Sequence, residues 1–122
     1  MIIEEQVILI RINQGYYDNI SKEKLYEVTR GIWKINPQRA SDVKYAFALF
    51  KGIIKEVYQV NQWHKAGTLK YLHRDSSSFA DSNRWEFEGR IANREIRSKY
   101  IGESLKDYFS KGSQNPIKYV NC

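Results

Sequence analysis

The fold is decided by residues 44–60, which read KYAFALFKGIIKEVYQV. Apolar and β-branched side chains fill two runs, Lys44–Phe50 and Ile53–Val60, and Gly52 between them can adopt the positive φ of a tight turn. We therefore predict a β-hairpin at this position. In its first arm alanines alternate with large side chains, so another backbone can approach one face closely, as tight barrels require.

The segments before the hairpin predict one strand and one helix. Val7–Ile12 is a β-branched run, typical of a strand that is buried on at least one side. Ser21 is a suitable N-cap for a helix over Lys22–Arg30, and Gly31 offers a stop. The order strand, helix, then several strands predicts an α+β domain, here a small mixed β-barrel with a few short helices.

The segments after the hairpin are less regular. Trp63 is predicted in a loop over 61–67, and Trp85 is expected in the core of a strand whose alternating Glu86 and Glu88 face solvent. The other expected elements are a polar turn over Arg39–Asp42, a short strand over Thr68–His73, a polar loop over Arg74–Asn83, helical stretches over Arg94–Tyr100 and Glu103–Phe109, and a final strand over Ile117–Asn121.

Length and charge limit the classes of protein that fit. A chain of 122 residues forms a single domain over residues 1–122, and its net charge of +6 attracts polyanions such as nucleic acid or anionic lipid, although it is also ordinary for solubility. The only cysteine, Cys122, cannot form an internal disulfide, so we expect a reducing, cytoplasmic environment. No apolar run is long enough to cross a bilayer, so no membrane partner is expected.

Complete catalytic and metal motifs are missing from the sequence. His64, His73 and Cys122 lack the close pairs that wrap a zinc ion, and the scattered glycines form no phosphate-binding loop. Ser76–Ser78 lie in a polar loop that would not hold a nucleophile rigidly. Tyr100–Gly102 matches half of a GIY-YIG nuclease signature, but the other half is not at the required spacing. These patterns predict no metal, no cofactor and no catalytic residue, and they favour a non-enzymatic function.

Aromatic and basic residues occur together in a pattern that favours nucleic-acid binding. Trp33 follows Arg30 by three residues and directly precedes Lys34, and Trp63 follows the hairpin. Stacking of a base on an indole, with a cation on the phosphate, is how many small modules hold single nucleotides or strands. We therefore predict that Trp33 and Trp63 border one open cleft of roughly nucleobase size.

The remaining candidate residues complete the predicted site. Arg30, Lys34 and Arg39 are expected to steer the nucleic-acid backbone. Asn115 and Tyr119 can supply hydrogen bonds to a base edge, although Asn115 before a proline can equally satisfy turn backbone. The full set of predicted binding residues is Arg30, Trp33, Lys34, Arg39, Trp63, Asn115 and Tyr119.

Several segments together resemble a known family pattern. They are 25–33 (LYEVTRGIW), 45–48 (YAFA), 52–58 (GIIKEVY), Trp63, 84–87 (RWEF) and 115–121 (NPIKYVN). They look like an uncharacterised bacterial domain that sits beside GIY-YIG nuclease modules in some proteins. Their order is also similar to the PUA-like superfamily, with its EVE, YTH and ASCH branches, although the full helix-turn motifs of EVE and YTH are missing.

The resemblance covers most of the chain and implies a small β-barrel that holds RNA or a flipped-out modified base in an aromatic-lined pocket. Trp33 would then lie in the pocket turn after the first helix, and Trp63 would form an aromatic wall. Two alternatives stay open: an interaction or regulatory module that docks onto a nuclease or another effector protein, and an RNA hydrolase of the ASCH type. The choice between DNA and RNA, the modification of the base and the oligomeric state stay open as well.

Overall fold

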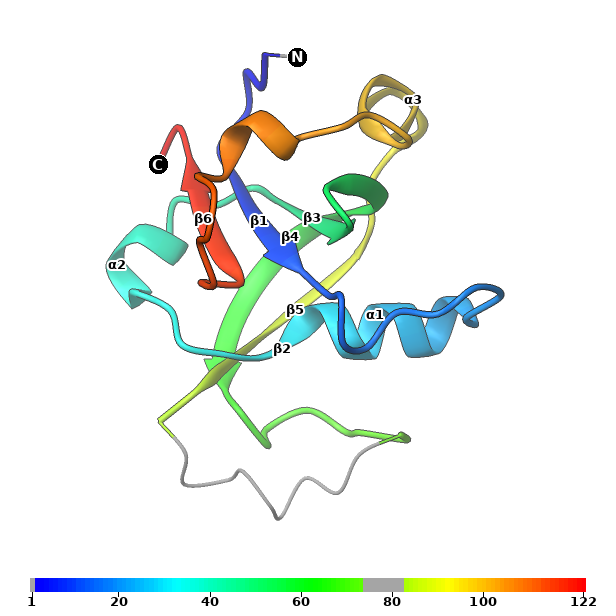
Figure 1. The fold of residues 1–122 in the computed structure, drawn as a ribbon. Helices are drawn as coiled ribbons and strands as arrows, with labels where there is room; N and C mark the ends of the chain where they lie inside the picture. Colours follow the sequence, from blue (N-terminus) through cyan, green and yellow to red (C-terminus); the bar gives the residue numbers. More distant parts are fainter. Residues whose placement is uncertain (1, 74–82) are drawn as a thin grey trace.

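The computed structural model describes residues 2–73 and 83–122, and in these ranges the chain forms one six-stranded sheet with short helices packed on it (Figure 1). In chain order the elements are β1 (Val7–Arg11), α1 (Lys22–Arg30), β2 (Gly31–Trp33), α2 (Pro37–Ala40), β3 (Tyr45–Phe50), β4 (Ile53–Lys65), β5 (Trp85–Ile91), α3 (Arg94–Tyr100), the 3-10 helix η2 (Lys106–Tyr108) and β6 (Ile117–Val120). The predicted α+β class is confirmed. The polar loop predicted over Arg74–Asn83 falls, except for Asn83, outside the described residues.

The sheet has the strand order β2-β5-β4-β3-β1-β6 and curls as a half-barrel. The predicted hairpin is confirmed by the antiparallel pairing of β3 with β4, in which Phe47 lies opposite Val57. Strand β1 pairs in parallel with β3 and antiparallel with β6, so the sheet is mixed. Strands β2 and β6 lie at its two edges, and we call the space between these edge strands the seam.

Strand β1 is buried on both faces, because each face of the sheet carries its own hydrophobic cluster. Val7 and Leu9 enter the cluster that includes Tyr100 of α3. Ile8 and Ile10 enter the other cluster, which includes Val28 of α1 together with the two small alanines of β3. Side chains of α1 and Trp33 of β2 pack on this second cluster, so the cluster supports one edge of the seam.

Helix α1 and strand β2 follow each other without a loop, and this junction positions the seam. The predicted cap is confirmed, because the Ser21 side chain accepts a hydrogen bond from the Lys24 N–H at 3.1 Å. At the other end Gly31 continues directly from the helix into β2, as the first residue of that strand. The Trp33 indole N–H then donates to the Thr29 carbonyl at 2.8 Å, which ties β2 back to the last turn of α1.

Some predicted boundaries are wrong. Strand β4 runs on to Lys65, so Trp63 lies on a strand and not in a loop, because the pairing with β5 continues to the end of the strand. Residues 68–73 form no strand. Within 103–109 the only helix is the short η2. Of the polar turn expected over Arg39–Asp42, residues 41–42 form a turn, whereas Arg39 and Ala40 are the last residues of α2, which Asn36 caps.

The alternation predicted for β5 is also wrong at Glu86 and Trp85. Glu86 is 0% exposed, because the segment after β4 folds over it and its carboxylate accepts hydrogen bonds from the Gly67 and Leu69 N–H groups and from the Tyr71 hydroxyl. Trp85 is half-buried and lies outside both hydrophobic clusters. Burial in this strand is therefore set by a distant segment and not by local alternation.

Candidate functional site

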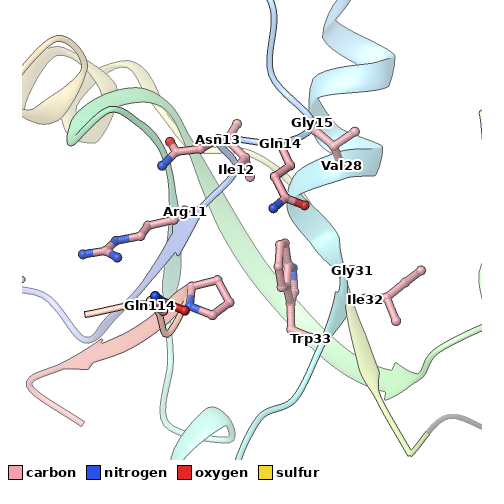
Figure 2. Close-up of a pocket in the computed structure, with 11 residues that line it drawn as sticks. Arg11, Ile12, Asn13, Gln14, Gly15, Val28, Gly31, Ile32, Trp33 and Gln114 are labelled. Carbon is pink, nitrogen blue, oxygen red and sulfur yellow. The ribbon is translucent and has the colours of Figure 1, made fainter. Parts of the chain in front are cut away.

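A cleft of about 660 Å³ opens at the seam, and we call it the Trp33 cleft (Figure 2). Three parts of the chain form its walls: residues 11–15 at the end of β1, the junction of α1 with β2, and Gln114 with Pro116 just before β6. These parts are distant in the sequence and meet only because β1, β2 and β6 belong to one curled sheet. The volume lies inside the range of about 300–1,000 Å³ that is typical of small-molecule sites.

The Trp33 indole is the main aromatic surface of this cleft. Its ring is half-buried, and Figure 2 shows it rising from β2 towards the amide of Gln14. The indole N–H is already satisfied by Thr29, so the ring needs no further polar partner and its orientation is fixed. A fixed, partly exposed indole is suited to stack on a planar ligand.

Amide side chains supply the polar groups of the Trp33 cleft. Gln14 and Gln114 are exposed, and each amide can both donate and accept hydrogen bonds. Asn13 is partly committed, because its Oδ1 accepts from the Lys51 N–H at 2.9 Å. Arg11 is held at the rim, where its guanidinium lies 3.6 Å from the centre of a phenylalanine ring and donates to the Ser113 carbonyl at 2.8 Å. The cleft thus offers an aromatic face, neutral amides and one cation.

A second hollow, of about 440 Å³, lies on the other side of residues 113–117, and we call it the basic hollow. Along this segment the lining alternates: Gln114 and Pro116 line the Trp33 cleft, whereas Ser113 and Asn115 line the basic hollow. One short segment is therefore the shared wall of both. The basic hollow brings together four of the predicted residues, which are Lys34, Arg39, Asn115 and Tyr119.

Tyr119 connects the two edges of the seam within the basic hollow. Its hydroxyl accepts a hydrogen bond at 2.9 Å from the N–H of Asn36, which caps α2, and Figure 1 shows α2 beside β6. The Arg39 guanidinium stacks 4.4 Å from the Tyr119 ring centre and donates to the Cys122 main-chain oxygen from Nε and Nη2. Burial raises the pKa of Tyr119, so its hydroxyl stays protonated at neutral pH.

Asn115 also has a defined structural role. Its Oδ1 accepts a hydrogen bond from the Ile117 N–H at 3.0 Å. The oxygen of this side chain therefore satisfies the backbone of the turn, as one of the two interpretations of Asn115 predicts. The rest of its exposed side chain borders the basic hollow. Asn115 therefore shapes the shared wall as well as lining the hollow.

The electrostatics of the two spaces favour an anionic ligand. The described residues that line them include four cations, Arg11, Lys34, Arg39 and Lys118, and no carboxylate. Lys34 and Lys118 are exposed, so water solvates their ammonium groups when no ligand is bound. The free site therefore carries no cost of an unpaired buried charge at these two residues. The excess positive charge seen in the composition is thus concentrated in part at the seam.

Two predicted residues do not reach these spaces. Arg30 is only 4% exposed; its guanidinium lies 4.2 Å from the Tyr71 ring centre and donates to the Lys70 carbonyl at 2.6 Å, so it is not placed to steer a ligand at the surface. Trp63 packs edge-on against Phe87, with 5.5 Å between the ring centres, and it does not line the Trp33 cleft. The predicted cleft shared by two tryptophans is therefore not formed, because extended β4 turns Trp63 into the second hydrophobic cluster.

The polar lining residues that the sequence did not predict include Arg11, Asn13, Gln14, Gln114 and Lys118. The only local signal was Asn13-Gln14, a polar pair that follows the first buried strand. Among residues 2–73 and 83–122, His, Cys, Asp and Glu side chains form no group of three or more that could hold a metal ion. No helix in those ranges has the length and apolar character needed to span a membrane.

Comparisons of the chain with protein-family models, with curated proteins and with solved structures gave no significant match. The resemblance to PUA-like domains is therefore a hypothesis carried by the residues named above.

Proposed function

We propose that the chain binds nucleic acid at the seam, with a base in the Trp33 cleft and the adjoining phosphates in the basic hollow. One observation carries this proposal: a fixed, partly exposed indole lies in a cleft of about 660 Å³ that shares a wall with a hollow lined by three cations and no carboxylate. Affinity for a nucleic-acid backbone comes mainly from such cations, and stacking adds to it for every base type.

The contents of the Trp33 cleft favour a base that has left its stack. An indole can contact a base face only when that face is free, in a single strand or in a flipped-out nucleotide. The neutral amides of Gln14 and Gln114 match the mixed donors and acceptors of base edges. The cleft therefore suits the heterocyclic base of a nucleotide, and the anionic phosphates of that nucleotide suit the cations of the basic hollow.

We include the PUA-like assignment and a cytoplasmic location in this proposal. The confirmed order of α1, the Trp33-bearing strand and the β3–β4 hairpin supports the first, and the hydrogen bond from the Asn36 N–H to the Tyr119 hydroxyl supports a barrel that closes at the seam. The lone cysteine supports the second. Under the PUA-like hypothesis Trp33 keeps its pocket position, whereas the proposed role of Trp63 as a wall is replaced by the two glutamines.

Replacing Trp33 by alanine tests the stacking step. We expect Trp33→Ala to weaken binding of a short mixed-sequence single strand about 10- to 100-fold, since base–aromatic stacking contributes about 1–3 kcal/mol. Trp33→Phe keeps an aromatic face and should lose much less. Fluorescence anisotropy with labelled RNA and DNA measures both affinities, and circular dichroism establishes that the variants are folded. Unchanged affinity in folded Trp33→Ala would refute the proposal.

The salt dependence of binding separates nucleic-acid binding from docking onto a protein. With phosphates at Lys34, Arg39 and Lys118, the logarithm of the association constant should fall with the logarithm of salt concentration with a slope of about −2, because each contact on a single strand contributes about −0.7. Titration of a labelled single strand with the unmodified chain, repeated at several salt concentrations, measures this slope. A slope near zero would instead support the interaction-module alternative, since an apolar docking surface is insensitive to salt.

A further inference from the structure

A third hollow, of about 460 Å³, adjoins the basic hollow, and we call it the Trp85 hollow. The described residues that line it are Lys34, Ile35, Pro37, Asn83 and Trp85, and Lys34 lines the basic hollow as well. We propose that the Trp85 hollow holds the base next to the one in the Trp33 cleft, so that the chain binds a single strand of two or more nucleotides. This inference rests on the proposed function and extends it.

The placement of the two indoles carries the first step. Trp33 of β2 lies directly opposite Trp85 of β5 in the antiparallel pairing, so their backbones are one strand spacing apart, about 4.8 Å. Each indole lines a different hollow, and both rings are half-buried. Successive bases of a single strand stack on successive aromatic side chains in many proteins that bind without strong sequence preference.

The charge between the indoles carries the second step. Lys34 directly follows Trp33 and lines both the basic hollow and the Trp85 hollow, so this exposed lysine connects the proposed phosphate site with the second base position. A strand that runs from one indole to the other would bring the phosphate that links its two bases to this residue. The described lining of the Trp85 hollow contains no carboxylate that would oppose such a phosphate.

A second cation lies at the far side of Trp85. The Lys65 ammonium is 4.6 Å from the centre of the Trp85 ring and 3.4 Å from Asn83 Oδ1, and its side chain is exposed. This contact resembles the way a cation and an aromatic ring pair in nucleic-acid grooves. A flexible lysine can yield the ring face to a base and follow the next phosphate.

The floor of the Trp85 hollow is apolar and rigid. Pro37 is the first residue of α2, where the Asn36 side chain accepts hydrogen bonds from the following N–H groups. Ile35 packs on the second hydrophobic cluster. A preorganised apolar floor beside an indole lowers the entropic cost of ordering a base there.

Dinucleotides with and without the second base test the inference. The probes are a full dinucleotide and its two isomers in which one nucleotide is abasic, so that all three carry the same phosphate. We expect the unmodified chain to bind the full dinucleotide about 5- to 100-fold more tightly than either isomer, since each stacked base adds its own contribution. Competition against a labelled strand, in RNA and DNA series, measures these affinities.

Two variants of Trp85 locate the second base. Trp85→Leu fills a similar apolar volume without an aromatic face, and it should bind the full dinucleotide no better than the better of the two isomers. Trp85→Phe keeps the aromatic face and should retain most of the preference. Trp33→Ala should weaken all probes that carry a base in the Trp33 cleft. Full preference for the dinucleotide in folded Trp85→Leu would overturn the inference and leave the Trp33 site intact, whereas an unaffected Trp33→Ala would overturn the proposed function itself.

Discussion

Replacing Glu86 by alanine is expected to lower the free energy of unfolding by about 3–5 kcal/mol, because a buried carboxylate that serves several half-buried donors is lost, and each donor left unsatisfied costs about 1–3 kcal/mol. Among the described residues, three donors bond to this fully buried carboxylate: the N–H groups of Gly67 and Leu69 and the hydroxyl of Tyr71. A loss of this size is a large part of the total stability of a small domain, which is about 5–15 kcal/mol. Urea denaturation followed by circular dichroism measures it.

Glu88→Ala is the matched control for this prediction. Glu88 lies on the same strand but is exposed, and its side chain bonds to His64 at 2.9 Å. An exposed pair contributes about 1 kcal/mol or less, so this variant should lose little stability. Glu86→Gln, which keeps the volume and one acceptor oxygen, should fall between the two. Equal losses for Glu86→Ala and Glu88→Ala would show that the buried carboxylate does not hold the segment that covers it.

The elements that the sequence predicted well are those with local signals. The N-cap at Ser21 fixes the start of α1, and the β-branched run fixes β1, because in both cases the deciding contacts are made within a few residues. The β3–β4 hairpin follows from two apolar runs around Gly52, whose φ is +79° in the structure. Each of these signals can be evaluated without knowing where the rest of the chain lies.

The errors occur where a distant segment decides burial. The alternation of apolar and acidic residues over 85–88 predicts one solvent-facing side of the strand. Residues 67–71 cover that side at Glu86. The sequence of β5 itself contains no signal for this contact. Likewise, no glycine or proline marks the end of the hairpin after Val60, so the extension of β4 through Trp63 depends on the pairing with β5. Which strand pairs with β4 depends on the topology of the whole sheet, so the local sequence cannot predict it.

The candidate site likewise contains residues that local signals predict and residues that only the strand order brings together. The sequence predicts Trp33 and Lys34 because an aromatic and a basic residue stand together shortly after a recognisable helix, and both line the seam. Gln14 and Gln114 were missed because polar residues in turns are common, and only the pairing of β1 with β6 brings the two segments together. The residues were thus identified by type, whereas their assembly required the strand order.

Reversing two lysine charges at the basic hollow is expected to have the largest effect on binding. In the double variant Lys34→Glu/Lys118→Glu, the affinity for a single strand should fall about 100-fold at moderate salt, and the magnitude of the salt slope should decrease by about 1.4, since each lost phosphate contact removes about 0.7. The loss should be similar for every base sequence, because phosphates carry no sequence information. Fluorescence anisotropy at several salt concentrations measures both quantities.

Lys22→Glu/Lys106→Glu is the matched control, because it separates a local site from the overall charge. Both double variants lower the formal net charge from +6 to +2, since each lysine-to-glutamate change removes two units. Lys22 and Lys106 are exposed and line none of the three hollows, so their reversal should weaken binding only a few-fold through the long-range field. Equal losses in both double variants would mean that net charge alone attracts the nucleic acid and that the seam is not its binding site. A loss confined to the first variant, with an unchanged melting temperature, would place the phosphates at Lys34 and Lys118.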